Sequence, residues 1–282
     1  MTNNFISEKY SERIIRIKGI DTTASYLVCG DNKNCLIDTG MGYGSLREYI
    51  EEDLNKKIDF VILTHGHLDH CGGIYEFKDL PIYMNHKDIE LGNQSNTQDN
   101  RYESLKSLNI EKDNVQPNIN FNITKDLKDN DEFDLGNLTL KAIYTPGHTL
   151  GMTMILIKEE RTILFGDGCG VGVLLFLPYS TCVEEYRDTL INLKKHEDEY
   201  DKIIRNHGTC ESEKDLLDNV IECCELILER KDDKADTYDA LPSDIQGKKI
   251  YYAKAIDPKT HDRIDGKFGN IAYSEDKIYK NK

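Results

Sequence analysis

The most constraining feature of the chain is a group of histidines that follows directly on an apolar run. Residues 60–63 read Phe-Val-Ile-Leu, as a buried strand does, and residues 64–72 read Thr-His-Gly-His-Leu-Asp-His-Cys-Gly. Gly66 lets the backbone bend, so neighbouring side chains can converge. Imidazole and carboxylate groups together suit zinc or ferrous iron. Because a surface loop seldom has this spacing, we predict a metal site built from His65, His67, Asp69 and His70.

The length and composition indicate an ordinary globular protein. The chain has 282 residues, of which 38% are hydrophobic, enough for one large domain or two modest ones. No apolar run approaches the length of about 18 residues that a membrane-spanning helix needs. The first thirty residues lack the basic start and apolar run of a secretory signal. We therefore expect a cytoplasmic protein without a membrane partner.

Cysteine content and charge argue against several kinds of site. The eight cysteines form no C-x-x-C pair, so neither a zinc ribbon nor a thioredoxin-type site is indicated. We expect reduced, mostly buried thiols, including Cys71 and Cys169 near the proposed ligands. The formal charge is −15, with 51 acidic and 36 basic residues, and the lysines and arginines are scattered. Since such a chain repels polyanions at long range, a nucleic-acid partner is not expected.

Strands and helices alternate in both halves of the chain. The polar range 85–131 is interpreted as an insertion over one face, with helical pieces at 86–91 and 101–108, and its His86 as a solvated or capping residue. The tail 231–282 is interpreted as an extension, packed on a domain of residues 1–230 and containing a small hairpin. The other expected strands are 14–17, 25–29, 34–37, 138–144, 152–157, 162–165 and 203–204, and the other expected helices 45–55, 183–199 and 212–229.

Three later residues have the same context as the first group, a polar ligand just after a strand. His148 follows the strand that ends at Tyr144, Asp167 follows the one that ends at Phe165, and His207 follows residues 203–204. Each ligand is next to a glycine, which allows a close turn of the backbone toward a shared centre. Together with the first group they make seven candidate ligands, enough for two ions.

These motifs, in this order, resemble the metallo-β-lactamase-fold hydrolase superfamily over residues 13 to 230. The resemblance implies an α/β fold, an αβ/βα four-layer sandwich of two mixed β-sheets flanked by helices, with the metal site at one edge. It implies that His65, His67 and His148 bind one ion. Asp69, His70 and His207 would bind the second, and Asp167 would bridge the two. Zinc is the expected metal, with ferrous iron or manganese as alternatives.

Comparison with branches of this superfamily narrows the expected chemistry. Class B β-lactamases generally have a cysteine where this chain has Asp167, and flavodiiron proteins have a glutamate in place of His67. Glyoxalase II enzymes and acyl-homoserine lactonases have an aspartate at the bridging position, and in this respect the chain resembles them. The resemblance therefore implies hydrolysis of an ester, thioester or lactone of a small molecule by a metal-bridging hydroxide. Asp69 would orient that hydroxide and pass a proton to the leaving group.

The substrate contacts and two other enzyme classes stay open at this stage. The apolar loop Gly170–Ser180 follows Asp167 and suits an acyl chain or ring, and equally a buried connection. Tyr179 is a candidate oxyanion donor in that loop. A phosphodiesterase or nuclease such as ribonuclease Z has a similar first motif, and an iron enzyme resembling persulfide dioxygenases uses a 2-His-1-carboxylate site. A binding protein that lost its activity is the non-enzymatic alternative. The oligomeric state is not indicated.

Overall fold

The structure is a computed structural model and describes residues 5–280. Its first sheet has seven strands in chain order, antiparallel from β1 to β4 and parallel from β4 to β7. These strands are β1 (Ile6–Lys9), β2 (Ile14–Lys18), β3 (Ala24–Cys29), β4 (Asn34–Ile37), β5 (Phe60–Ile62), β6 (Ile82–Met84) and β7 (Lys125–Asp126). The polar range 85–131 thus ends in a strand of this sheet.

The second sheet has six strands in the order β14-β13-β11-β10-β9-β8, with one parallel pair, β11 and β13. Both sheets are therefore mixed, as the resemblance implied. The strands are β8 (Glu132–Asp134), β9 (Thr139–Tyr144), β10 (Thr153–Ile157), β11 (Thr162–Leu164), β13 (Lys202–Ile204) and β14 (Glu211–Ser212).

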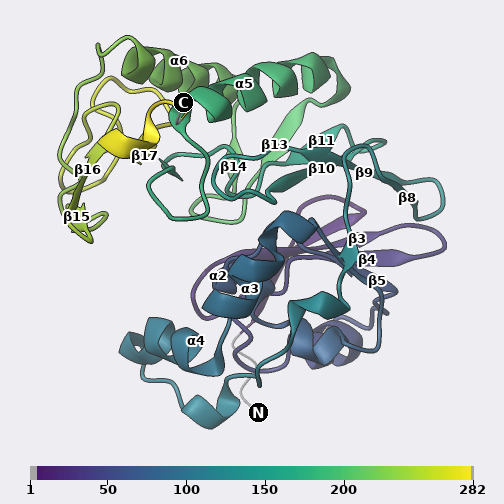
Figure 1. Ribbon diagram of the computed structural model, residues 1–282. Helices are drawn as coiled ribbons and strands as arrows, with labels where there is room; N and C mark the ends of the chain where they lie inside the picture. The colour runs from purple at the N-terminus through teal and green to yellow at the C-terminus, as the bar shows by residue number, and fades with distance from the viewer. Residues whose placement is uncertain (1–4, 281–282) are drawn as a thin grey trace.

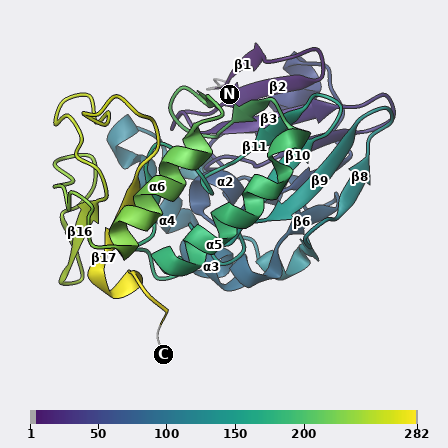
Figure 2. The ribbon, with the colours of Figure 1, turned by 90° about the horizontal axis from the view of Figure 1, so that it is seen from above.

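Helices cover the outer faces of the two sheets (Figure 1). In Figure 2, α5 and α6 lie side by side over the second sheet. The helices are α1 (Leu46–Glu48), α2 (Leu68–Cys71), α3 (Ile89–Ser95), α4 (Gln98–Leu105), α5 (Val183–Leu193) and α6 (Leu216–Leu228). A π-helical turn, Tyr49–Asp53, continues α1, and 3₁₀ turns lie at Ile74–Phe77, His86–Asp88, Lys106–Leu108, Lys112–Asn114, Phe121–Ile123, Lys194–Glu199 and Glu275–Lys277.

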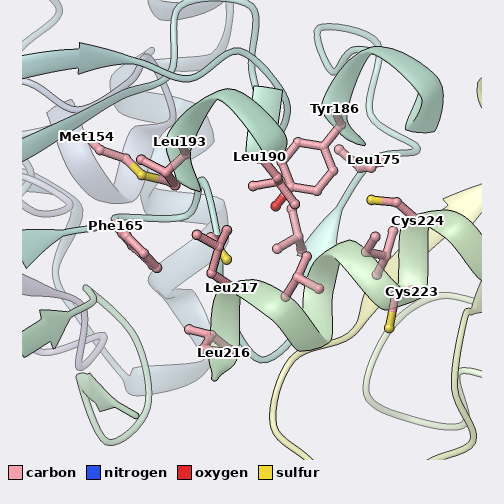
Figure 3. Packing of buried hydrophobic residues seen from close by; sticks show 14 of the residues in the cluster. Met154, Phe165, Leu175, Tyr186, Leu190, Leu193, Leu216, Leu217, Cys223 and Cys224 are labelled. Carbon is pink, nitrogen blue, oxygen red and sulfur yellow. The ribbon is translucent and has the colours of Figure 1, made fainter. Parts of the chain in front are cut away.

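Separate apolar layers hold these elements together. One layer lies between the sheets and joins Tyr26 and Ile62 of the first sheet to Leu140 and Ile155 of the second. Another packs the second sheet against α5 and α6 (Figure 3). Burying each large side chain of these layers stabilises the fold by about 1.5–3 kcal/mol. The expected four-layer sandwich is confirmed.

The tail after residue 231 forms most of a third, small sheet. Its strands are β15 (Asp244–Ile245), β16 (Lys248–Tyr252) and β17 (Ile271–Ser274). The antiparallel pair β16 and β17 corresponds to the predicted hairpin of residues 250–252 and 271–273, and β15 adds to β16 on its other side. A fourth strand, β12 (Val173–Leu174), comes from the apolar loop after Asp167 and pairs in parallel with β17. The tail therefore packs on the loop that the sequence analysis singled out for substrate contact.

Residues 5–280 can be searched for membrane-spanning helices and for disulfide bonds. No helix in this part of the chain combines the length and apolarity of a membrane span. All eight cysteines are free thiols, and Cys71 and Cys169 are buried.

Candidate metal centre

The seven predicted ligands come together where strands of both sheets end. His65 and His67 follow β5, and α2 then carries Asp69 and His70. His148 follows β9, while Asp167 and His207 follow the parallel neighbours β11 and β13. Hydrogen bonds join the two sheets at this edge: Thr153 donates its backbone N–H to the carbonyl of Thr64 at 2.9 Å, for example. The fold thus gathers seven side chains that are spread over some 140 positions of the sequence.

Three histidines form the first cluster, His65, His67 and His148. The Nδ1 atom of His67 lies 3.1 Å from Nε2 of His65 and 2.9 Å from Nε2 of His148. Two nitrogens bound to one tetrahedral zinc at about 2.0–2.1 Å lie about 3.4 Å apart. The three ring nitrogens therefore face one another at nearly the spacing that one shared ion imposes.

The second cluster contains Asp69, His70, Asp167 and His207. Nε2 of His207 lies 3.3 Å from a carboxylate oxygen of Asp69 and 3.3 Å from one of Asp167. Nε2 of His70 is 3.2 Å from that of His207. Two imidazoles and two carboxylates are donors that zinc, iron and manganese accept.

Asp167 lies between the two clusters. Its Oδ2 is 3.5 Å from Nε2 of His148 in the first cluster and 3.5 Å from Nε2 of His70 in the second. One carboxylate can therefore contact an ion in each cluster. This is the bridging position that the resemblance implied for Asp167.

The electrostatics of the two clusters differ. Burial lowers the pKa of His65 and His67 and lowers that of His148 to about 4, and the neighbouring histidines add to the effect. These imidazoles are neutral at pH 7, as metal binding requires. In the second cluster burial opposes protonation, but the Asp69 and Asp167 carboxylates outweigh it.

The pKa of His207 is thereby raised to about 10, and that of His70 is raised well above its usual range. Burial raises the pKa of Asp69 and Asp167, yet the charged histidines lower both below the ordinary value. Protons thus offset the carboxylate charge where a cation would otherwise do so. A divalent ion would displace them, so this donor set fits a cation.

Asp38 was not among the site residues predicted from the sequence; it lies behind the second cluster and is fully buried. Its carboxylate accepts the backbone N–H of Thr64 at 2.8 Å and the Nδ2 group of Asn206 at 2.9 Å, and lies 2.9 Å from Nδ1 of His70. This contact leaves Nε2 of His70 facing the cluster, as an outer partner of a metal ligand does. Asp38 directly follows β4 and has a φ of 61°, which turns it out of the strand direction. Its place after a buried strand was the one available signal.

Asp88 is a second residue that sequence reasoning missed. Its buried carboxylate accepts the N–H of Gly66 at 2.9 Å, the hydroxyl of Thr149 at 2.6 Å and the N–H of Gly151 at 2.6 Å. The side chain therefore ties the loop of His65 and His67 to the loop of His148. His86 lies two residues before Asp88 and belongs to neither cluster. Its Nε2 atom is 3.1 Å from the carbonyl oxygen of Thr124.

A cavity of about 910 Å³ opens beside both clusters. His67, Asp69, His148, Asp167 and His207 form part of its wall. Most of the remaining wall is apolar and comes from the predicted loop and the tail, with Val171, Val173, Leu174, Leu177, Leu241 and Phe268. A pocket of this size and polarity accommodates a small molecule with an apolar group.

Tyr179 does not lie on this wall among the residues that the structure describes. Its hydroxyl donates to the side-chain oxygen of Gln94 at 2.7 Å. The apolar loop therefore reaches the cavity through residues 170–174 and Leu177. The substrate contact of Tyr179 stays a prediction, and this residue is not one of those that line the cavity.

Comparison with known proteins supports the same family. The sequence profile of the metallo-β-lactamase superfamily matches residues 19–200, a range that contains six of the seven clustered residues and stops before His207. The beta-lactamase-like protein 2 homolog of Caenorhabditis elegans is 26% identical over 79% of this chain and 69% of its own length. The human acyl-coenzyme A thioesterase MBLAC2 is 27% identical over 55% of this chain, which spans 61% of that relative.

Solved structures share the fold. The superfamily protein ST1585 from Sulfolobus tokodaii superposes with a TM-score of 0.52 at 20% identity, over 71% of this chain and 79% of that one. A metallo-beta-lactamase from Pontibacter korlensis gives 0.59 at 14% identity, over 78% of this chain and 99% of the other. The assignment to the glyoxalase II and lactonase-like branch is tested by none of these similarities. The profile match and the shared fold establish that this chain belongs to the metallo-β-lactamase superfamily.

Proposed function

We propose that the protein is a binuclear metal-dependent hydrolase that cleaves a carboxylic thioester, ester or lactone of a small molecule, with a thioester as the first candidate. The observation that carries the proposal is the position of Asp167 between two ligand clusters that both border an apolar cavity. The thioester is favoured because two relatives carry that activity in their names, the human acyl-coenzyme A thioesterase and the atrochrysone carboxyl ACP thioesterase of Aspergillus chevalieri.

Each of the seven clustered side chains has a role in such a reaction. His65, His67 and His148 would hold one ion, Asp69, His70 and His207 the other, and Asp167 both. Two divalent ions supply a Lewis acid for the carbonyl and, by lowering the pKa of a water, a hydroxide at neutral pH. In the net reaction a C–O bond forms, the C–S bond breaks, and the thiol leaves with one proton of the water.

Asp69 is the candidate for proton transfer. Its side chain is 27% exposed and is on the cavity wall, so it can reach both the centre and the substrate. As a ligand of the second ion, the Asp69 carboxylate would be ionised and could accept a hydrogen bond from the attacking water. From the same oxygen it would pass the proton to the departing sulfur. An Asp69→Asn protein with both metals and undiminished turnover would contradict this role.

Metal analysis together with a substrate panel tests the proposal. The protein is purified, its metal content is measured, and chelator-treated samples are reloaded with zinc, manganese or ferrous iron. Each sample is assayed on thioesters, lactones, phosphodiesters and β-lactams. We expect about two ions per chain and turnover of a thioester, ester or lactone that chelation abolishes. One iron per chain with oxygen consumption, or cleavage of phosphodiesters alone, would contradict it.

A further inference from the structure

The tail adds a second chamber beside the main cavity. A smaller cavity of about 340 Å³ shares six wall residues with the main one: Val171, Gly172, Ala240, Tyr252, Asp262 and Phe268. The main cavity is largely apolar, whereas His261, Arg263 and Lys267 contribute to the wall of the smaller chamber. The two cavities therefore adjoin at these six residues, with a largely apolar space beside the metal centre and a more polar one next to it.

Tyr252 is the shared wall residue with an unused hydrogen-bonding group. Its side chain is buried, with the residue 8% exposed, and no other residue in the described range 5–280 hydrogen-bonds its hydroxyl. A Cβ added at Gly172 would lie 3.5 Å from this hydroxyl, which places it over the backbone of the loop that follows Asp167. The hydroxyl oxygen is not among the enclosed side-chain atoms that lack a partner in residues 5–280, so it is open to the cavities that Tyr252 lines. It is therefore free to donate a hydrogen bond to a bound molecule.

The strand that carries Tyr252 holds the hydroxyl in place. The backbone of Tyr252 exchanges two hydrogen bonds with Ala235, at 2.9 and 3.0 Å, and the residue pairs with Ala272 of β17. Its ring packs in an apolar cluster with Phe176 and Ile256. A donor fixed on a strand and by packing is well placed to select one orientation of a ligand.

The smaller chamber is suited to a neutral polar group rather than to a phosphate. Its three basic side chains each contact a carboxylate: His261 with Asp239 at 2.8 Å, Arg263 with Asp265 at 2.5 Å and Lys267 with Glu222 at 2.7 Å. The carboxylate of Asp262 also contributes to this wall. Because acidic groups offset these cations, an anionic ligand gains little there, while an amide finds donors and acceptors.

We infer that Tyr252 is a substrate-binding residue whose hydroxyl donates a hydrogen bond to an amide carbonyl in the leaving-group arm of a thioester, with the acyl group in the apolar cavity. The inference rests on the proposed thioester hydrolysis. It goes further in stating that the tail binds the leaving-group arm of the substrate and not the acyl group. The arm would pass Tyr252 and enter the smaller chamber.

Two thioesters that differ in one group test the inference. S-octanoyl-N-acetylcysteamine carries an amide in its leaving arm, and S-butyl thiooctanoate carries an alkyl arm of similar length. With metal-loaded protein we expect Tyr252→Phe to lower kcat/KM about tenfold on the amide thioester, the loss of one hydrogen bond to substrate. On the butyl thioester kcat/KM should stay within about twofold. The metal content and Tm should not fall, because the lost hydroxyl has no partner in the described part of the chain.

Tyr273→Phe is the matched control from the neighbouring strand. The Tyr273 hydroxyl donates to Asp232 at 2.6 Å and is on neither cavity wall. This variant should lose stability and keep the ratio of kcat/KM between the two thioesters. Equal effects of Tyr252→Phe on both thioesters, or none on either, would overturn the inference while the proposed function stands. A metal-loaded wild type that cleaves neither thioester but hydrolyses an ester or lactone would overturn the inference alone, and one that hydrolyses none of these classes would overturn both.

Discussion

Asp38 illustrates how much of the metal centre depends on single side chains behind the ligands. Its two oxygens serve four groups, the backbone N–H and the hydroxyl of Thr64, the amide of Asn206 and Nδ1 of His70. An asparagine at this position would place an N–H₂ group against at least one of these donors. The ligand His70 would then lose the partner that orients it, as outer partners of metal-bound histidines do.

We therefore predict that Asp38→Asn weakens the binding of the second ion by about 10–100-fold. The unmet buried donors should also lower the free energy of unfolding by about 1–3 kcal/mol. Zinc titration and denaturant unfolding measure the two effects. Asp59→Asn is the control, because Asp59 accepts the backbone N–H of Asn34 at 2.9 Å near the other end of β5. Equal zinc affinity in wild type and Asp38→Asn would contradict the prediction.

The raised pKa of His207 makes the free energy of unfolding of the metal-free protein depend on pH. Although burial opposes protonation, the Asp167 and Asp69 carboxylates raise its pKa from 6.5 to about 10. A histidine whose pKa is raised on folding stabilises the fold fully below the unfolded value, and this contribution is lost as the pH rises through the folded value. The stabilisation is therefore complete below about pH 6.5 and absent above about pH 10.

The measurement compares wild type with His207→Gln in the presence of a chelator. The difference in unfolding free energy between the two proteins should be largest near pH 6 and should shrink toward pH 10. Titrating groups that do not interact with His207 cancel in this difference, whereas Asp69, Asp167 and His70 are coupled to it and belong to the measured effect. A difference that grows with pH would show the opposite sign and refute the assignment. Added zinc should stabilise the wild type more at pH 8 than at pH 6, since the ion displaces protons.

At the scale of elements, most ligands are positioned by a strand end and a tight turn, and Asp69 and His70 by the short helix α2. Gly147 precedes His148, and a Cβ there would lie 2.2 Å from the ring of Tyr186 on α5. The turn and the helix are therefore in direct contact. Gly66 is similarly close, because a Cβ there would lie 2.9 Å from the carbonyl oxygen of Asp88. These glycines set how near the ligand loops come to the layers around them.

Gly147→Ala should displace the turn of His148 from α5. We expect a loss of stability of about 1–3 kcal/mol, as for overpacked positions, and reduced occupancy of the first ion. Thermal unfolding and metal analysis measure both. Gly170→Ala is the matched control for these two quantities, since a Cβ there would meet only Arg205 at 3.8 Å. If Gly147→Ala behaved like Gly170→Ala, the close contact would not limit the position of His148.

At the scale of the whole molecule, the tail is part of the core of the second half. Its side chains Ile271, Tyr273 and Ile278 are fully buried in the cluster that also contains α5 and α6. Each contributes about 1.5–3 kcal/mol by burial. Their sum is comparable with the entire stability of a typical domain, about 5–15 kcal/mol.

Deletion of residues 231–282 should therefore prevent cooperative folding rather than merely change the substrate preference. The truncated chain is expected to bind hydrophobic dyes and to lack a sharp thermal transition. Ile264→Ser serves as a control within the tail, because this residue is 70% exposed and should tolerate the change. A truncated chain with an unchanged Tm would mean that residues 1–230 fold independently.

Much of this organisation was predictable because the relevant signals are local in the sequence. The expected strands before the ligands correspond to β5, β9, β11 and β13, and the predicted helices in the second half to α5 and α6. Alternating apolar residues and neighbouring glycines carry such information within a few positions. Helix ends were less accurate: the predicted helix 183–199 ends as an α-helix at Leu193 and continues as a 3₁₀ turn.

The sequence by itself determined which side chains are able to bind ions, because a ligand is recognisable from its chemical type and from the strand that precedes it. Only the tertiary structure decided which residues support and surround them. Asp38 meets Asn206 across 168 positions of the chain, and Tyr252 reaches the cavity from β16, far along the chain from the loop that follows Asp167. Such contacts depend on how distant segments pack, and no local pattern encodes that packing.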